Sequence, residues 1–233
     1  MKSITIAIDG FSSTGKSTLA KQLAKSLEYI YVDTGAMYRA VTLYAIEKGF
    51  ISRDTIDEHC LIQSLDAIQL KFIYNENTGI AEIFLNDRNV EHEIRTLEVS
   101  KKVSEISEFE EVRIKLVNLQ KEMGTGKGVV MDGRDIGTSV FPNAELKFFM
   151  TASPDRRAHR RYKELLDKGE LVTFEEVLEN IEKRDYIDSN RKFSPLRKAF
   201  DAITLDNSDM GLEEQFQRIH GFALRTIDKK NNL

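Results

Sequence analysis

Several features that define specialised classes of protein are scarce or missing in this sequence. A single cysteine, Cys60, occurs among the 233 residues. One cysteine cannot form an internal disulfide or a cysteine metal cluster, which agrees with a reducing compartment. No apolar stretch approaches the roughly 20 residues that span a bilayer, and Met1 to Ser3 lead into a strand-like segment without the apolar core of a signal peptide. We therefore expect a cytoplasmic protein.

An excess of positive charge is also missing. Lys and Arg total 34 against 38 Asp and Glu, a net charge of −4, which argues against general binding to nucleic acid or to a membrane surface. Repeats, low-complexity tracts and long linkers are absent as well. The 41% hydrophobic content suffices for a core, and the length fits one large α/β domain or a core with inserted lobes. Composition thus favours a compact enzyme.

A phosphate-binding loop is the strongest motif present. Residues Gly10 to Ser17 match G-x-x-x-x-G-K-[ST], between an apolar run at 4–8 and apolar residues at helical spacing from Leu19. The glycines let backbone N–H groups converge on a polyphosphate, Lys16 can reach its β and γ oxygens, and Ser17 can ligate Mg²⁺. The sequence therefore predicts a site for the phosphates of a nucleotide and for Mg²⁺. Its predicted members are Gly10, Phe11, Ser12, Ser13, Thr14, Gly15, Lys16, Ser17 and Thr18.

The rest of the chain alternates between strand-like and helix-like segments. Strands are expected near 29–32, 128–133, 146–150 and 202–206, with helices after 34, two between 96 and 123, and one at the end. Residues 66–90 differ, because alternating apolar positions on both sides of a turn at 75–79 predict an antiparallel hairpin with a third strand beside it. The expected fold is α/β, a doubly wound parallel sheet with a P-loop, a small antiparallel insert and an Arg-rich helical segment around 153–169.

Residues beyond the loop narrow the class of P-loop protein. The guanine-reading N-K-x-D motif of GTPases is missing, and Gly133 stands where a hydrolytic ATPase has an activating Glu. Arginines recur instead, and they suit a transferase that holds two anions together. Taken singly, Arg39 and Arg160 have the pattern of surface ion-pair partners. The arginines concerned are Arg39, Arg95, Arg113, Arg134, Arg157, Arg160, Arg161, Arg184 and Arg191.

Six sequence blocks, in order, resemble the bacterial cytidylate kinase family over nearly the whole chain. They are Gly10–Thr18, Asp33–Arg39, Glu93–Thr96, Asp132–Thr138, Arg157–Arg161 and Arg184–Arg191. The resemblance implies ATP-dependent phosphorylation of CMP and dCMP by one kinase domain over 1–233. It implies a core of about 1–33, 124–152 and 200–233, a CMP-binding lobe of about 34–123 with its β insert at about 66–92, and a lid with following helices at about 153–199.

The resemblance also implies roles for single residues. The acceptor, chiefly its phosphate, is assigned to Thr34, Tyr38, Arg39, Arg134 and Arg191; its cytosine edge to Ser104, Arg113 and Asp135; and its sugar to Arg184 and Asp188. The ATP phosphates are assigned to Arg157 and Arg161. The residues assigned to catalysis are Lys16, Arg134, Arg157, Arg161 and Asp132. A carboxylate, an arginine and a hydroxyl complement the donors and acceptors of cytosine. Transfer needs no general base, because the acceptor phosphate is already ionised near neutral pH.

Departures from the family pattern and alternative functions define the questions left open. Phe11 stands where Pro is common, Ser17 is Gly in some members, and Glu91 and His92 replace smaller residues. We expect a monomer that acts on the small molecules CMP and dCMP and binds neither nucleic acid nor a membrane. The alternatives are a P-loop kinase for UMP, dTMP, shikimate or gluconate, and a module that binds ATP without turnover.

Overall fold

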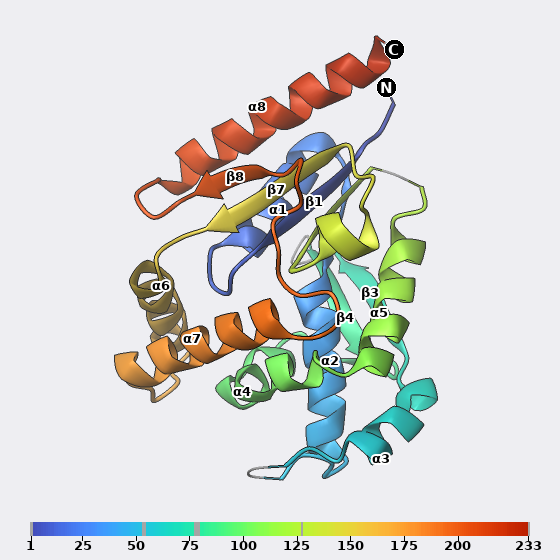
Figure 1. Ribbon diagram of the computed structural model, residues 1–233, viewed down its shortest axis with the longest axis vertical. Helices are drawn as coiled ribbons and strands as arrows, with labels where there is room; N and C mark the ends of the chain where they lie inside the picture. The colour runs from blue at the N-terminus through green and yellow to red at the C-terminus, as the bar shows by residue number, and fades with distance from the viewer. Residues whose placement is uncertain (1, 53–54, 77–79, 127, 233) are drawn as a thin grey trace. The chain divides into compact units, whose positions relative to one another are not determined.

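A computed structural model describes residues 2–52, 55–76, 80–126 and 128–232 of the chain (Figure 1). Residues 1, 53–54, 127 and 233, which fall within the predicted core and lobe, lie outside this description, as do residues 77–79 of the predicted hairpin turn. The chain divides into two compact units, residues 1–32 with 121–233 and residues 33–120. Each unit is described by itself.

The elements follow the alternation that the sequence predicts. In chain order they are β1 (Thr5–Gly10), α1 (Lys16–Leu27), β2 (Ile30–Asp33), α2 (Thr34–Glu47), α3 (Glu58–Gln63), η1 (Leu65–Ala67), β3 (Leu70–Asn75), β4 (Ile80–Leu85), β5 (Arg88–Asn89), η2 (Glu93–Arg95), α4 (Leu97–Ile106), α5 (Glu110–Met123), β6 (Val129–Gly133), η3 (Ile136–Val140), β7 (Leu146–Thr151), α6 (Pro154–Asp167), α7 (Phe174–Asn190), β8 (Ile203–Asp206) and α8 (Leu212–Asn231).

The larger unit is built on a five-stranded sheet in the order β2-β6-β1-β7-β8. Strand β1 runs parallel to β6 and β7, so that Ile8 pairs with Asp132 on one side and with Phe148 on the other. Because the strands are parallel, the loops after β1, β6 and β7 leave the sheet at one edge. Those loops carry the P-loop, Arg134 with Asp135, and the start of α6.

One core joins the sheet to α1 and α8. Leu19 and Leu23 of α1 and Ile219 of α8 are fully buried and belong to one cluster with Ile6, Phe148 and the other apolar residues of the central strands. Figure 1 shows α8 lying along the sheet, with the two chain ends close together. The backbone N–H of Lys2 donates to Asn231 Oδ1 at 2.8 Å. The P-loop therefore follows a strand, β1, whose Ile6 and Ile8 are packed in this core.

The smaller unit holds the predicted antiparallel insert. Strands β3, β4 and β5 form a separate sheet, in which Leu70 pairs with Leu85 and Phe84 with Asn89. The apolar residues that alternate along β3 and β4 bury one face of this sheet, with Leu70, Ile83 and Leu85 below a tenth exposed. The α/β class with a mostly parallel sheet and a small antiparallel insert is confirmed. Among the described residues, no helix is both long and apolar enough to cross a membrane.

Candidate active site

The P-loop is held in shape by its first glycine. Gly10 has φ +147°, and a Cβ placed on it would lie 2.0 Å from the carbonyl oxygen of Met150 in β7. Ser13 (φ +58°) and Gly15 (φ +87°) also adopt positive φ values, and Gly15 begins α1 with no side-chain cap. The backbone therefore turns as a phosphate-binding loop requires, with the first-turn N–H groups of α1 at its end.

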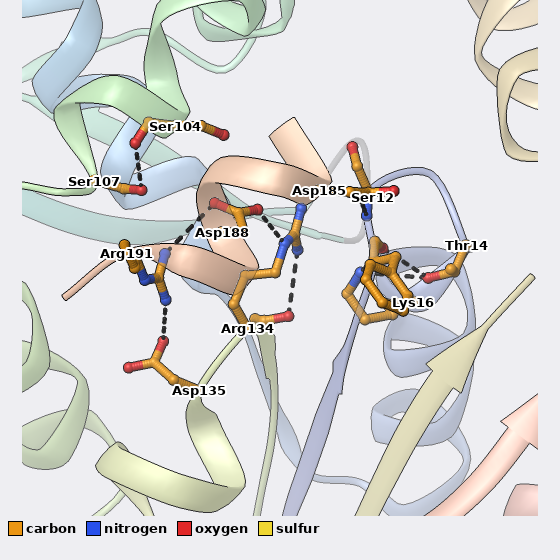
Figure 2. A network of polar contacts seen from close by, with 12 residues as sticks. Ser12, Thr14, Lys16, Ser104, Ser107, Arg134, Asp135, Asp185, Asp188 and Arg191 are labelled. Carbon is orange, nitrogen blue, oxygen red and sulfur yellow. Dashed lines mark hydrogen bonds and ion pairs between the residues drawn. The ribbon is translucent and has the colours of Figure 1, made fainter. Parts of the chain in front are cut away.

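Lys16 points back into this loop. Its Nζ donates to the carbonyl oxygen of Phe11 at 2.6 Å and to Thr14 Oγ1 at 3.3 Å, and the residue is only 5% exposed (Figure 2). Burial, followed by repulsion from Arg134, lowers the pKa of Lys16 well below its usual value. A polyphosphate supplies the negative charge that favours the protonated form of such a lysine.

Ser17 and Asp132 form an oxygen pair that fits a magnesium ion. Ser17 Oγ donates to Asp132 Oδ2 at 2.8 Å, and the hydroxyl of Tyr31 donates to the other carboxylate oxygen at 2.8 Å. Mg²⁺ prefers oxygen ligands and is commonly held by one or two protein groups together with substrate phosphates and water. Within the described parts of the chain, no group of three or more His, Cys, Asp or Glu side chains could hold a metal ion alone.

Two arginines and two aspartates form a buried charge cluster at the ends of β6 and α7. Figure 2 shows Asp188 between Arg134 and Arg191, with Arg191 also pointing to Asp135. Arg134 Nε donates to Asp188 at 2.8 Å, and Arg191 lies 3.4 Å from Asp135 and 3.5 Å from Asp188. Although burial acts in the opposite sense, Arg134 and then Arg191 lower the pKa of Asp188. Arg184, also buried on α7, adds a third positive charge to this region.

Three arginines of helix α6 have different kinds of partner. Arg157 is buried and donates to the carbonyl oxygens of Ala152 (2.9 Å) and Ser12 (3.2 Å). Arg160 donates to Asn207, once to its side chain at 3.0 Å and once to its carbonyl oxygen at 2.7 Å. Arg161 pairs with Glu164 one turn along the helix, at 2.8 Å. The first turns of α6 are thus anchored beside the P-loop.

Asp9 is a buried residue at the candidate site that sequence reasoning missed. Its carboxylate accepts from the backbone N–H groups of Ile136 (2.8 Å) and Gly137 (2.7 Å). It thereby binds the first two N–H groups of η3, a single turn of π-helix that directly follows Arg134 and Asp135. Burial raises the pKa of Asp9 to about 7. An Asp at the last polar position of a buried strand, just before the P-loop glycine, was the available signal.

In the smaller unit, an N-cap and ion pairs stabilise the start of α2. Asp33 caps the helix by accepting from the Ala36 N–H at 2.9 Å, and Arg95 donates to Asp33 at 2.9 Å and to Glu91 at 2.7 Å. Although burial acts against it, Arg95 and then Arg39 lower the pKa of Asp33 to about 2. Glu91, which stands where the family pattern has a smaller residue, is therefore an ion-pair partner of Arg95. Thr34 is buried beside this cap.

Two of the three residues assigned to the base edge, Ser104 and Arg113, lie on α4 and α5 of the same unit, whereas the third, Asp135, follows β6 in the larger unit. Arg113 is 3% exposed, and its guanidinium carbon lies 5.3 Å from the centre of the Tyr38 ring. Arg113 also donates to the Ser107 carbonyl at 3.3 Å, and Ser107 Oγ donates to the carbonyl of Ser104 at 2.8 Å (Figure 2). The smaller unit thus places Arg113 beside the Tyr38 ring and joins it to Ser107, whose hydroxyl binds the Ser104 carbonyl. The binding roles assigned to individual residues stay predictions.

Comparison with known proteins identifies the family. The family model described as cytidylate kinase matches residues 6–223. The chain is 61% identical over 219 residues to a cytidylate kinase of Flavobacterium johnsoniae, covering 94% of this chain and 95% of the relative. It is 58% identical to a cytidylate kinase of Flavobacterium psychrophilum over the full length of both.

A solved shikimate kinase from Bacteroides thetaiotaomicron has a TM-score of 0.45 at 14% identity, covering 95% of this chain and 98% of that one. A likeness of this size supports no conclusion about function. The sequence relatives and the family model decide the matter. The chain belongs to the cytidylate kinase family, a group of kinases that use ATP to phosphorylate a nucleoside monophosphate.

Proposed function

We propose that the chain transfers the γ-phosphoryl group of ATP to CMP and dCMP, giving ADP with CDP or dCDP. The observation that carries this proposal is the buried cluster around Asp188, in which Arg134 directly follows β6, the strand that pairs with β1. The guanidinium groups of Arg134, Arg184 and Arg191 lie here near the carboxylates of Asp135, Asp185 and Asp188. Buried charges are costly unless paired, so such a cluster favours a ligand that brings both an anion and hydrogen-bonding groups.

Each part of the cluster suits one part of a nucleotide. Arg134 and Arg191 are assigned to the acceptor phosphate, where guanidinium groups bind oxygen pairs in bidentate fashion. Asp188 and Arg184 are assigned to the sugar, because an ionised carboxylate accepts from hydroxyl groups. Asp135 is assigned to the amino group of cytosine. The smaller unit contributes Thr34, Tyr38 and Arg39 to acceptor binding and Ser104 with Arg113 to the base.

Catalysis in this proposal is positioning and charge neutralisation. The P-loop N–H groups and Lys16 orient the β and γ phosphates, and Arg157 and Arg161 neutralise charge that spreads over the transferring group. Ser17 and Asp132 would hold Mg²⁺, which neutralises phosphate charge when bound. No side chain removes a proton from the acceptor, because its phosphate is already ionised. Residues 34–123 act as the acceptor lobe, with the insert at 66–92, and 153–199 as the lid with its following helices.

The test compares acceptors in a coupled assay for ADP release with Mg²⁺ and ATP. CMP and dCMP are expected to be used with the highest kcat/KM, UMP and dTMP with less, and shikimate and gluconate not at all. Each unpaired buried polar group penalises the wrong base by about 1–3 kcal/mol. A higher kcat/KM for UMP than for CMP contradicts the proposed acceptor. ATP binding without turnover on any acceptor contradicts the kinase reaction itself.

Three variants separate base recognition from sugar recognition. Arg113→Met and Asp135→Ala are expected to lower kcat/KM for CMP and dCMP and to narrow the gap to UMP, with the KM for ATP nearly unchanged. Asp188→Ala is the matched comparison, and it is expected to weaken use of both cytidine nucleotides while keeping the preference over UMP. Loss of base preference in the Asp188 variant alone contradicts this division of roles.

A further inference from the structure

Asp185 of α7 makes contacts that none of the assigned roles explains. Its Oδ1 accepts from the backbone N–H of Ser12 in the P-loop at 3.3 Å, and its Oδ2 accepts from Arg157 Nη1. Arg157 in turn donates to the Ser12 carbonyl oxygen at 3.2 Å. One carboxylate and one guanidinium therefore hold both the N–H and the carbonyl of the same loop residue.

These groups are withdrawn from solvent. The side chain of Arg157 is 3% exposed and that of Asp185 is 15% exposed. A buried guanidinium needs a charged partner, since removal of one member of a buried pair is strongly destabilising. Arg157 also lies 5.3 Å from the ring centre of Phe11, and the Phe11 ring packs edge-on against Phe149. The arrangement therefore fixes the side chain of Arg157 against the first half of the loop.

The negative charge of Asp185 beside the P-loop is unexpected, because a carboxylate next to a triphosphate site repels the ligand. Arg157 neutralises it at hydrogen-bond distance. Asp185 is also near the acceptor arginines: although burial acts the other way, Asp188 and then Asp185 raise the pKa of Arg134. The Asp185 carboxylate thus binds the P-loop and Arg157 and lies near Arg134, and both of its oxygens accept hydrogen bonds from protein groups.

We propose that Asp185 is a positioning residue for ATP. It fixes the P-loop through Ser12 and keeps Arg157 turned toward the loop, while its own oxygens stay bonded to protein groups. This role rests on ATP being the phosphoryl donor and is independent of which monophosphate is the acceptor. A loop held in this way binds the triphosphate without first paying an ordering cost.

The experiment uses the full-length protein and the variant Asp185→Asn. Asn keeps an oxygen that accepts from Ser12 but removes the charge that pairs with Arg157. The matched control is Asp209→Asn, because Asp209 pairs with Arg156 of the same helix at 3.1 Å in an exposed setting. The dissociation constants of a non-hydrolysable ATP analogue and of CMP are measured separately by calorimetry, with thermal unfolding in parallel.

Asp185→Asn is expected to raise the dissociation constant of the ATP analogue about 10- to 100-fold, the range for misplaced positioning groups, with that of CMP within about threefold. Asp209→Asn is expected to change neither. Unchanged ATP-analogue affinity with a lower unfolding temperature overturns the proposal, because the role is then structural alone. Tighter binding also overturns it, since the carboxylate then only repels ATP.

A second variant covers failure of Asp185→Asn to fold. Asp185→Glu keeps the charge beside Arg157 and moves the carboxylate by one methylene group. It is expected to fold and to bind the ATP analogue more weakly than wild type, and wild-type affinity in this variant overturns the proposal. Failure to use CMP as acceptor leaves these binding results unaffected, so the two proposals fail separately.

Discussion

Replacing Gly10 by alanine tests how closely the P-loop is packed on the sheet. The new Cβ would lie 2.0 Å from the Met150 carbonyl oxygen and 2.9 Å from the backbone carbon and nitrogen of that residue. Contacts of a Cβ below 3.0 Å essentially do not occur, so the loop and β7 must separate by about 1 Å, which amounts to overpacking. Gly10 pairs with Met150 in the sheet, and the end of that ladder is therefore expected to open.

The magnitude is the sum of two contributions. A residue with a side chain at this positive φ costs about 1–3 kcal/mol, and overpacking of a tight contact costs about 1–3 kcal/mol more. Gly10→Ala should therefore lower the free energy of unfolding by about 2–6 kcal/mol. Gly169→Ala is the matched control, because Gly169 has φ +79° with nothing within 4 Å of its added Cβ. That control isolates the backbone term of about 1–3 kcal/mol.

Urea unfolding of wild type and both variants measures the difference, and kcat/KM for ATP reports on the loop. A shift of about 1 Å in positioning groups can lower turnover about 100-fold, so Gly10→Ala should lose activity even under conditions where it is folded. Gly169→Ala should keep it. Equal stability of the two variants, together with wild-type kcat/KM for ATP in Gly10→Ala, would refute the steric reasoning.

Three further predictions concern single charges. Lys16→Met should keep its circular dichroism spectrum but lose at least about 100-fold in kcat, and near-normal turnover contradicts the P-loop assignment. Burial raises the pKa of Asp9 to about 7, so the folded protein binds more protons than the unfolded chain between about pH 4 and 7. The free energy of unfolding should therefore fall as the pH rises through that window. Urea unfolding at pH 5 and 8 measures this dependence, and Asp9→Asn should flatten it. Arg95→Ala should cost up to about 3–5 kcal/mol, because it removes the ion pair that Arg95 forms with buried Asp33. Arg88→Ala removes only exposed pairs with Glu47 and Glu93 and should cost less than about 1 kcal/mol; equal losses would contradict this reasoning.

The fold was predictable where local patterns repeat the final geometry. The apolar run at 4–8, the P-loop glycines and the helical spacing after Lys16 are contiguous, and the structure has β1, the loop and α1 there. The alternation along 68–85 likewise gives the antiparallel strands β3 and β4. Helix α3 was not predicted, since its six residues offer less than two turns of periodicity. The π-helical turn η3 has no periodic signal of its own.

The contacts within the site were less predictable because they join distant residues. Asp9 and Ile136 are 127 positions apart, and Ser12 and Asp185 are 173 apart. A sequence shows that each residue can accept or donate, but the fold decides which donors it meets. For Glu91, the departure from the family pattern left the local shape open, and the structure supplies its partner, Arg95.

The arginines show most clearly what sequence reasoning lacks. Their number predicted a site for anions, yet in the structure several of them already have carboxylate partners within the chain: Arg95 with Asp33, Arg134 with Asp188, Arg157 with Asp185, Arg161 with Glu164 and Arg191 with Asp135. A guanidinium buried without such a partner would carry a desolvation cost of several kcal/mol. A phosphate that binds these arginines must therefore compete with, or join, a carboxylate already in place. If these residues have the roles we propose, selectivity should depend on the aspartates as much as on the arginines, because a ligand that offers a phosphate but no donor groups leaves the displaced carboxylates without a compensating contact.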